Sequence, residues 1–226
     1  MSASLAESVQ QDIIKLITTN ELNPGDKLPT EYELADKLNV GRSTIREAVK
    51  ALASRNILKI KQGSGTFVSP GMGITKDPLG LSLICNDVNL AFDMINVRII
   101  FEPEMAALAA INATKDDCMK IGTACTIVED LIKNNEEYSK ADSSFHEAIA
   151  RASGNKIINR IVKVIHSSIQ KNIFVTEDSL RNDTLIYHRQ IVNAIKEHDV
   201  TGARCGMIMH LNNLRNFMTI KKRETR

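Results

Sequence analysis

The 226-residue sequence contains no apolar run that approaches the roughly 20 residues required for a membrane-spanning helix. Its N-terminal stretch, MSASLAESVQQDIIKL, lacks the basic start and apolar core of a signal peptide. The four cysteines form no CxxC pair, which argues against a disulfide framework or a thiolate zinc site and favours reduced thiols buried as small apolar side chains. These absences predict a cytoplasmic protein with no membrane partner.

The sequence also has little net charge, formally +2 at pH 7, but that charge is unevenly distributed. Residues 1–39 hold three lysines against seven acidic side chains, whereas residues 40–70 hold six Lys or Arg side chains against one glutamate. A basic segment next to an acidic one is typical of a protein with a phosphate-facing surface. A solvated helix face would give the same charges, so the charge pattern alone leaves both interpretations open.

Apolar periodicity predicts three helices before residue 57. Residues 5–19 repeat apolar side chains at helical spacing and are followed by the turn-forming residues Asn23-Pro24-Gly25-Asp26. Thr30 and Glu33 match a capping box at the start of a second helix. After a short glycine-containing turn, a third helix is expected to begin at Arg42.

Strand-like runs at residues 57–61 and 66–68 flank a glycine-rich turn and predict a hairpin. A hairpin directly after a helix-turn-helix is a wing, so residues 1–70 are expected to form a winged helix-turn-helix. The Pro- and Gly-rich residues 71–78 are interpreted as a linker. The predicted fold class is therefore mostly α, with a winged helix-turn-helix followed by an all-α bundle over residues 79–226. Its helices are expected near residues 89–111, 115–133, 136–152, 156–175, 178–197 and 200–220.

The segment from Leu28 to Val68 resembles the winged helix-turn-helix of the GntR family. The resemblance rests on three linked motifs: Leu-Pro-x-Glu, then Val-x-Arg-x-Thr-x-Arg-Glu-Ala in the recognition helix, then Gly-x-Gly-Thr-Phe-Val in the wing. It implies a transcriptional repressor that binds double-stranded operator DNA. Because one recognition helix reads only a half-site, a homodimer on a palindromic operator is expected.

A recognition helix meets base edges with its N-terminal residues, which here are Arg42, Ser43, Thr44 and Arg46. Arg42 and Arg46 are four residues apart and share a helix face, and a guanidinium can bind guanine or a phosphate. Ser43 and Thr44 can donate hydrogen bonds to phosphates. The alternative is that the two arginines only form surface ion pairs, with Glu47 or Asp36.

By resemblance, Gln62 and Gly63 at the tip of the wing would approach the minor groove. Tyr32 stands where many relatives have a DNA-contacting arginine. Its hydroxyl can hydrogen-bond a phosphate but carries no positive charge, so the operator sequence of those relatives is not transferable to this chain.

Residues 77–226 resemble the FCD effector-binding domain of the FadR-type GntR subfamily. The matching stretches are Val97-Arg98-x-x-x-Glu102-Pro103, Asp142-x-x-Phe145-His146, Ser153-Gly154-Asn155, His188-Arg189-x-Ile191-x-x-Ala194-Ile195 and Met209-His210-Leu211. The resemblance places Asp142, His146, His188 and His210 at the positions of metal ligands in metal-binding members. His166 and His198 match no ligand position.

Asp142 and His146 are four residues apart and therefore project from the same side of a helix. One carboxylate and three imidazoles suit Zn²⁺, Ni²⁺, Mn²⁺ or Fe²⁺, so a divalent metal is the expected cofactor. Taken singly, each histidine is more simply a satisfied core or surface residue. Arg98 has two interpretations, an intrahelical ion pair with Glu102 or a clamp for a carboxylate effector such as a hydroxy or sugar acid.

Three alternatives remain for the Asp/His group: a metalloenzyme, a regulator for which the metal itself is the signal, and a purely structural metal. The sequence has no HExxH motif and no carboxylate obviously placed as a general base, and a winged helix has no role in an enzyme. We therefore expect no catalytic residues. A regulator controlled by an organic acid is the favoured hypothesis.

Overall fold

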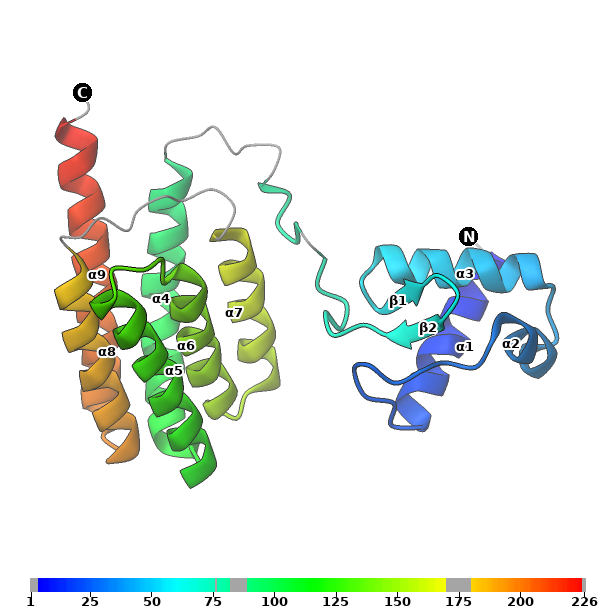
Figure 1. Cartoon of the computed structure of the whole chain (residues 1–226), viewed down its shortest axis with the longest axis horizontal. Coiled ribbons are helices and arrows are strands. Elements are labelled where there is room, and N and C mark those ends of the chain that lie inside the picture. The colour runs from blue at the N-terminus through cyan, green and yellow to red at the C-terminus, as the bar shows by residue number, and fades with distance from the viewer. Residues whose placement is uncertain (1–3, 76, 82–88, 170–179, 225–226) are drawn as a thin grey trace. The chain divides into compact units, whose positions relative to one another are not determined.

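The structure is a computed structural model that describes residues 4–75, 77–81, 89–169 and 180–224 (Figure 1). The chain divides into two compact units, Met1–Pro78 and Leu79–Arg226. No helix among the described residues is long and apolar enough to cross a membrane.

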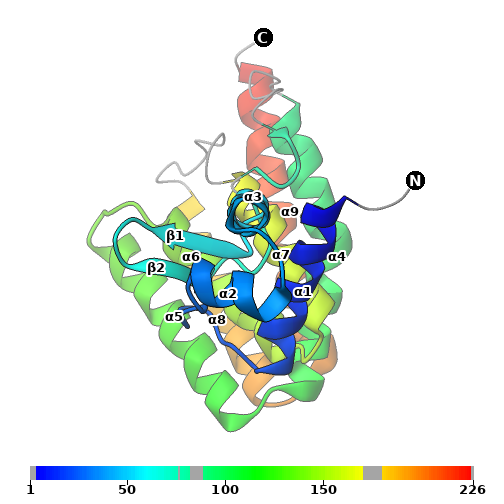
Figure 2. The same cartoon turned by 90° about the vertical axis from the view of Figure 1, so that its right-hand side faces the viewer.

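The first unit is a helix-turn-helix followed by a two-stranded wing, as predicted (Figure 2). Helices α2 and α3 begin at the predicted residues, and the capping box of Thr30 and Glu33 is present. Each strand differs from its prediction by one residue at its N-terminal end, and the strands pair antiparallel with Leu58 opposite Val68. The elements are α1 (Leu5–Thr19), α2 (Glu31–Leu38), α3 (Arg42–Ser54), β1 (Leu58–Lys61) and β2 (Gly65–Val68).

The core of this unit is built from apolar side chains contributed by all three helices and the wing. Ile13 of α1, Leu34 of α2 and Ile45 of α3 are almost inaccessible to solvent, and Leu58 and Val68 extend the same core under the wing. Because Ile45, Ala48, Val49 and Leu52 form the buried face of α3, the arginines at its N-terminal end lie on the opposite, exposed face.

The second unit is a helical bundle, and its described residues contain no strand. Helix α4 contacts α6, α7, α8 and α9 and lies at the centre of the bundle (Figure 1). The helices are α4 (Leu90–Asn112), α5 (Lys115–Lys133), α6 (Ser139–Ala152), α7 (Lys156–Ile169), α8 (Arg181–Lys196) and α9 (Val200–Glu224). The predicted end of the fourth of these, at residues 170–175, lies outside the described residues.

Helix α6 begins three residues later than the sequence predicted. Asn135 has a left-handed backbone with φ of 58°, which ends the preceding helical turn, and the Glu137 carboxylate accepts a hydrogen bond from the Ser139 amide. This turn chemistry keeps residues 136–138 out of the helix. It leaves Asp142 in the first turn of α6 and His146 one turn further along.

The prediction that the cysteines are buried holds for only one described thiol. Cys125 is fully buried, and burial raises its pKa to about 12. Cys118 is partly exposed and Cys205 is exposed on α9, so for these two the prediction was wrong. Cys85 lies outside the described residues.

Candidate DNA-binding surface and metal centre

The N-terminal end of the recognition helix α3 is open to solvent. Its N-cap, Gly41, has no side chain to cap the first turn, and Arg42 and Ser43 are exposed while Thr44 is half-buried. The unpaired amides of a first helical turn give it a partial positive charge, which attracts phosphate. The predicted DNA-contacting residues of this helix therefore lie together on one accessible surface.

Both arginines have partners from α2, although not the acidic partners considered from the sequence. Nη2 of Arg46 lies 2.9 Å from Oε2 of Glu31, and the guanidinium of Arg42 lies 3.8 Å from the centre of the Tyr32 ring. The Glu31 hydrogen bond raises the pKa of Arg46. The stacked Tyr32 ring is 63% exposed, so its hydroxyl is not committed to the core. This arrangement fixes the direction of two arginines that face solvent.

The turn of the wing presents Gln62 and Gly63 to solvent. Gly63 has φ of +71°, which favours glycine, and the Ser64 amide donates to the Lys61 carbonyl to close the turn. A side-chain-free residue at the tip lets the backbone approach a groove closely.

The four predicted metal ligands come together in the second unit, although they come from three helices. Asp142 and His146 lie on α6, His188 on α8 and His210 on α9, with one ligand atom of each within 4.8 Å of all the others. Nε2 of His188 lies 3.3 Å from Oδ1 of Asp142, and Nε2 of His146 lies 3.8 Å from Oδ2 of the same aspartate. The three histidines are buried, whereas Asp142 is partly accessible.

The electrostatics of this group keep Asp142 ionised and favour neutral rings at His146 and His210. Burial alone would raise the pKa of Asp142, but His146, His188 and His210 outweigh it and hold that pKa well below the usual range. Burial lowers the pKa of His210 strongly, and the neighbouring His188 and His146 lower it further. Burial also lowers the pKa of His146. Neutral imidazoles and an ionised carboxylate are the states that bind a divalent cation.

His188 provides the observation that tests whether these residues fit a metal. Neither of its ring nitrogens has a hydrogen-bond partner among the described residues, although the side chain is fully buried. A buried polar atom without a partner costs free energy, so native proteins rarely keep one. A cation held jointly with Asp142 would satisfy Nε2, so the donor set fits a metal ligated by nitrogen and oxygen.

Arg98 lies beside this group and forms the ion pair that was one of its two sequence-based interpretations. It is 5% exposed, and its Nε lies 2.7 Å from Oε1 of Glu102. Its Nη2 lies 3.4 Å from Oε2 of Glu102 and 3.1 Å from Nε2 of His146. Nη1 takes part in none of these contacts, so the ion pair does not use the whole guanidinium.

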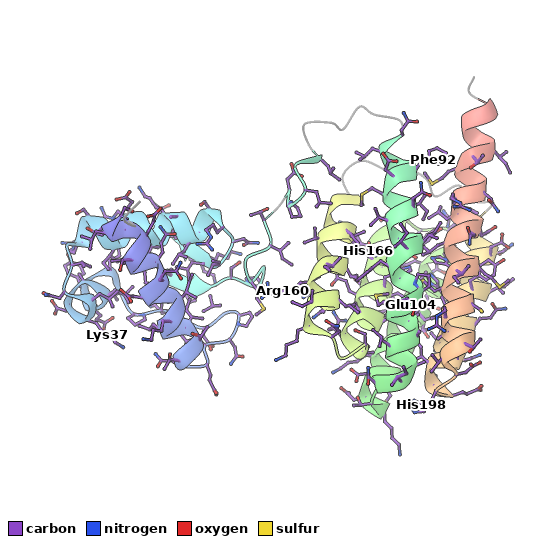
Figure 3. The ribbon with its side chains drawn as sticks, turned by 180° about the vertical axis from the view of Figure 1, so that it is seen from behind. Lys37, Phe92, Glu104, Arg160, His166 and His198 are labelled. Atoms are coloured by element: carbon purple, nitrogen blue, oxygen red, sulfur yellow. The ribbon has the colours of Figure 1, made fainter. Side chains whose placement is uncertain are left out.

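Glu102 is the site residue whose importance the sequence did not indicate. It is fully buried on α4, and besides Arg98 it contacts His146 and also His166 of α7, which is labelled beside α4 in Figure 3. The Arg98 spacing predicted one of these contacts, but no local pattern links residue 102 to residues 146 and 166. His198, the remaining histidine, is exposed and its Nδ1 lies 2.8 Å from the Ala110 carbonyl oxygen.

Comparison with known proteins identifies both units. Residues 5–68 match the description "Bacterial regulatory proteins, gntR family", and residues 93–213 match the FCD domain. The Uxu operon transcriptional regulator of Escherichia coli K12 is 29% identical over 95% of this chain and 88% of its own length. The transcriptional repressor NanR of the same strain is 28% identical over 93% of this chain and 82% of its own.

A solved structure, described as Streptococcus agalactiae GntR, is 39% identical and superposes with a TM-score of 0.83 over 94% of this chain and 100% of that one. Its likeness covers both units, and the matched relatives are transcriptional regulators rather than enzymes. The chain therefore belongs to the GntR family of bacterial regulatory proteins, as a DNA-binding transcriptional regulator with a C-terminal FCD domain.

Proposed function

We propose that this regulator is a repressor whose operator binding is controlled by a small organic acid bound beside a divalent metal. The observation that carries the proposal is the group of Asp142, His146, His188 and His210, in which neither ring nitrogen of the buried His188 has a hydrogen-bond partner among the described residues. Repression is supported by the 28% identical relative that is named a transcriptional repressor.

The four side chains would hold Zn²⁺, Ni²⁺, Mn²⁺ or Fe²⁺ through one carboxylate oxygen and three imidazole nitrogens. A bound ion would supply the positive charge that neutralises an incoming carboxylate. The protein's part is to keep the imidazoles of His146 and His210 neutral by burial and to hold the ligands in place from three helices.

Arg98 supports an acidic effector rather than a neutral one. Its guanidinium is 3.1 Å from His146, so an anion that binds at the metal would also lie near a second positive charge. The Glu102 ion pair neutralises part of that charge and holds the side chain in place. Nη1 of Arg98 would be the atom that binds the acid.

On DNA, each chain would place the N-terminal end of α3 in a major groove, with the wing over the neighbouring minor groove. One recognition helix covers one half-site, so two copies would bind a palindromic operator. Light scattering of the purified protein tests this, because a monomer that binds operator with one-to-one stoichiometry would contradict it.

The proposal as a whole is tested with operator DNA selected from random duplexes. The operator affinity of full-length protein is measured after metal removal, after reloading with Zn²⁺, and with a panel of hydroxy and sugar acids. We expect the acid to weaken operator binding by about 5- to 150-fold in loaded protein only. An equal acid response in stripped protein would leave the metal a structural role, and a response to Zn²⁺ alone would make the metal the signal.

A further inference from the structure

Glu102 gathers side chains from three helices around one buried carboxylate. Arg98 of its own helix contacts both oxygens, Nδ1 of His146 on α6 lies 2.7 Å from Oε2, and Nε2 of His166 on α7 lies 3.1 Å from Oε1. The four side chains are at most 5% exposed. A buried carboxylate with this many donors is well compensated for the loss of water.

Glu102, His146 and His166 also have one ligand atom each within 4.8 Å of the others, which raises the question of a second metal site. Arg98 argues against it. Its Nε lies 2.7 Å from the carboxylate, so the positive charge that a metal would bring is already supplied by the guanidinium. A second divalent ion here would meet that buried positive charge at close range. The cluster is better explained as support for the neighbouring Asp142 group.

Glu102 supports the Asp142 group by determining which ring nitrogen of His146 carries the proton. Nη2 of Arg98 can only donate and lies 3.1 Å from Nε2 of His146, so Nε2 is the acceptor and the single proton of a neutral ring is on Nδ1. Nδ1 lies 2.7 Å from Oε2 of Glu102, outside hydrogen-bond geometry but close enough for the carboxylate to favour a proton there over a lone pair. A neutral imidazole carries one proton, so with Nδ1 protonated the lone pair is on Nε2. That atom lies 3.1 Å from Nη2 of Arg98 and 3.8 Å from Oδ2 of Asp142, and it is the nitrogen that would bind a metal.

We propose that Glu102 is a positioning residue, which fixes His146 in the tautomer with its lone pair on Nε2 and is itself held by Arg98 and His166. This inference rests on the proposed metal site and adds to it a residue that touches no metal. Hydrogen-bonded carboxylates behind metal-binding histidines orient the ring and increase its basicity. The ring of His166 lies 5.1 Å from that of His146 at an angle of 26°, so it also limits rotation of the imidazole.

A carboxamide cannot replace this carboxylate, because both oxygens accept hydrogen bonds. If the oxygen of a glutamine at position 102 faced Arg98 and His166, its NH₂ group would face Nδ1 of His146 and favour the opposite tautomer. If it faced His146, the NH₂ group would oppose two donors. Glu102→Gln therefore keeps the shape of the side chain, removes its negative charge and disfavours a proton on Nδ1 of His146.

The first experiment measures Zn²⁺ affinity of full-length protein by competition with a chelator. We expect Glu102→Gln to raise the dissociation constant by about 10- to 100-fold. The matched control is Glu104→Gln, which makes the same substitution on the same helix at an exposed carboxylate paired with Arg204, and should leave Zn²⁺ affinity unchanged. Equal affinity of Glu102→Gln and wild type would overturn the inference. Wild type that binds no Zn²⁺ would instead overturn the proposed metal site.

The second experiment needs no metal and no substitution at Glu102. Two-bond ¹H–¹⁵N correlations of histidine rings in metal-free wild type report which ring nitrogen carries the proton, with His146 assigned by its loss in His146→Ala. We expect His146 with a protonated Nδ1. A protonated Nε2 with a bare Nδ1 would contradict the inference even if Glu102→Gln failed to fold. If that variant does fold, its His146 signals should shift toward the opposite tautomer.

Discussion

The two units differ in whether their polar functional groups are exposed to solvent or buried. In the first, Arg42, Arg46 and Tyr32 face solvent, and the buried cluster beneath them consists only of apolar side chains. In the second, Arg98 and Glu102 are enclosed in the bundle together with the three histidines of the Asp142 group. A surface that binds DNA must be accessible to a large polyanion, whereas a site for a small ligand gains strength from a low local dielectric.

The comparison has an energetic consequence. Exposed charges cost little desolvation and add little stability, so the candidate DNA-binding surface is nearly independent of the core of its own unit. Buried ionisable groups cost several kcal/mol unless they are compensated, so the second unit depends on each partner being present. That compensation is incomplete at both ring nitrogens of His188 and at Nδ1 of His146, which have no hydrogen-bond partner among the described residues. A substitution in one unit should therefore change the binding function of that unit and leave the binding function of the other unchanged.

The largest expected effect comes from replacing two ligands, in a His146→Ala, His188→Ala double variant. Metal binding and the acid response should both be lost, because two of the four ligand atoms disappear. Operator affinity should stay within about two-fold of metal-free wild type, since the candidate DNA-binding surface lies in the other unit. The measurement is an operator titration with and without acid and Zn²⁺. Loss of operator binding as well would show that the units are not separable.

The matched control for this variant is His198→Asn. His198 is outside the ligand group and has a left-handed backbone with φ of 57°, which asparagine tolerates. The variant removes one imidazole without straining the turn. Unchanged Zn²⁺ stoichiometry in it, with loss in the double variant, would assign the effect to the ligand group and not to histidine content.

The converse substitution is Arg46→Ala, on the candidate DNA-binding surface of α3. We expect operator affinity to fall by roughly 10- to 100-fold, the scale of one good bidentate contact to a base, while Zn²⁺ binding stays unchanged. Arg55→Ala, at the C-cap of the same helix, removes the same charge at the end remote from the groove and should cost much less. Fluorescence anisotropy with labelled operator measures both. Equal losses would mean that only general charge matters at Arg46.

The same contrast explains how much of the molecule could be predicted from its sequence. The capping box of Thr30, the start of α3 at Arg42 and the wing were predictable, because local turn chemistry and short-range periodicity determine them. In the bundle, the same signals predicted the helices but not their contacts. Asp142 and His146 share a face by spacing alone, whereas only family resemblance brought His188 and His210 to them.

Glu102 shows where sequence reasoning ends. Its contact with Arg98 follows from a spacing of four residues, but those with His146 and His166 join residues 44 and 64 positions apart. Nothing local to either histidine distinguishes a ligand from a side chain that supports one. The pairing of Arg46 with Glu31 was missed for a related reason, since the partner comes from the preceding helix and not from a neighbour in the sequence.

Acidification should also distinguish the units, in metal-free protein. The pKa values of His146 and His210 are lowered in the folded chain, so below about pH 6.5 the unfolded chain binds more protons than the folded one. Stability must then fall as pH falls. Between about pH 8 and pH 5.5 we expect the second unit to lose about 1–2 kcal/mol and the first, which has no histidine, to lose little. Calorimetry that shows equal losses in both transitions would refute this.

The smallest expected effect concerns Glu31, which we expect to compete with DNA for Arg46. In the free protein the Glu31 carboxylate holds the Arg46 guanidinium at 2.9 Å. Arg46 is exposed and Glu31 is partly exposed, and the pair must break or rearrange when Arg46 meets a base or phosphate. Glu31→Gln removes the ion pair and one negative charge near the DNA backbone. Exposed pairs contribute little and are screened by salt, so operator affinity should rise only by about two- to five-fold at roughly 50 mM salt and less at roughly 200 mM. Asp12→Asn, an exposed charge on α1, controls for net charge and should give a smaller gain. Weaker binding of Glu31→Gln at low salt would mean that Glu31 orients Arg46 for DNA, in which case the ion pair is part of the candidate DNA-binding surface and not its competitor.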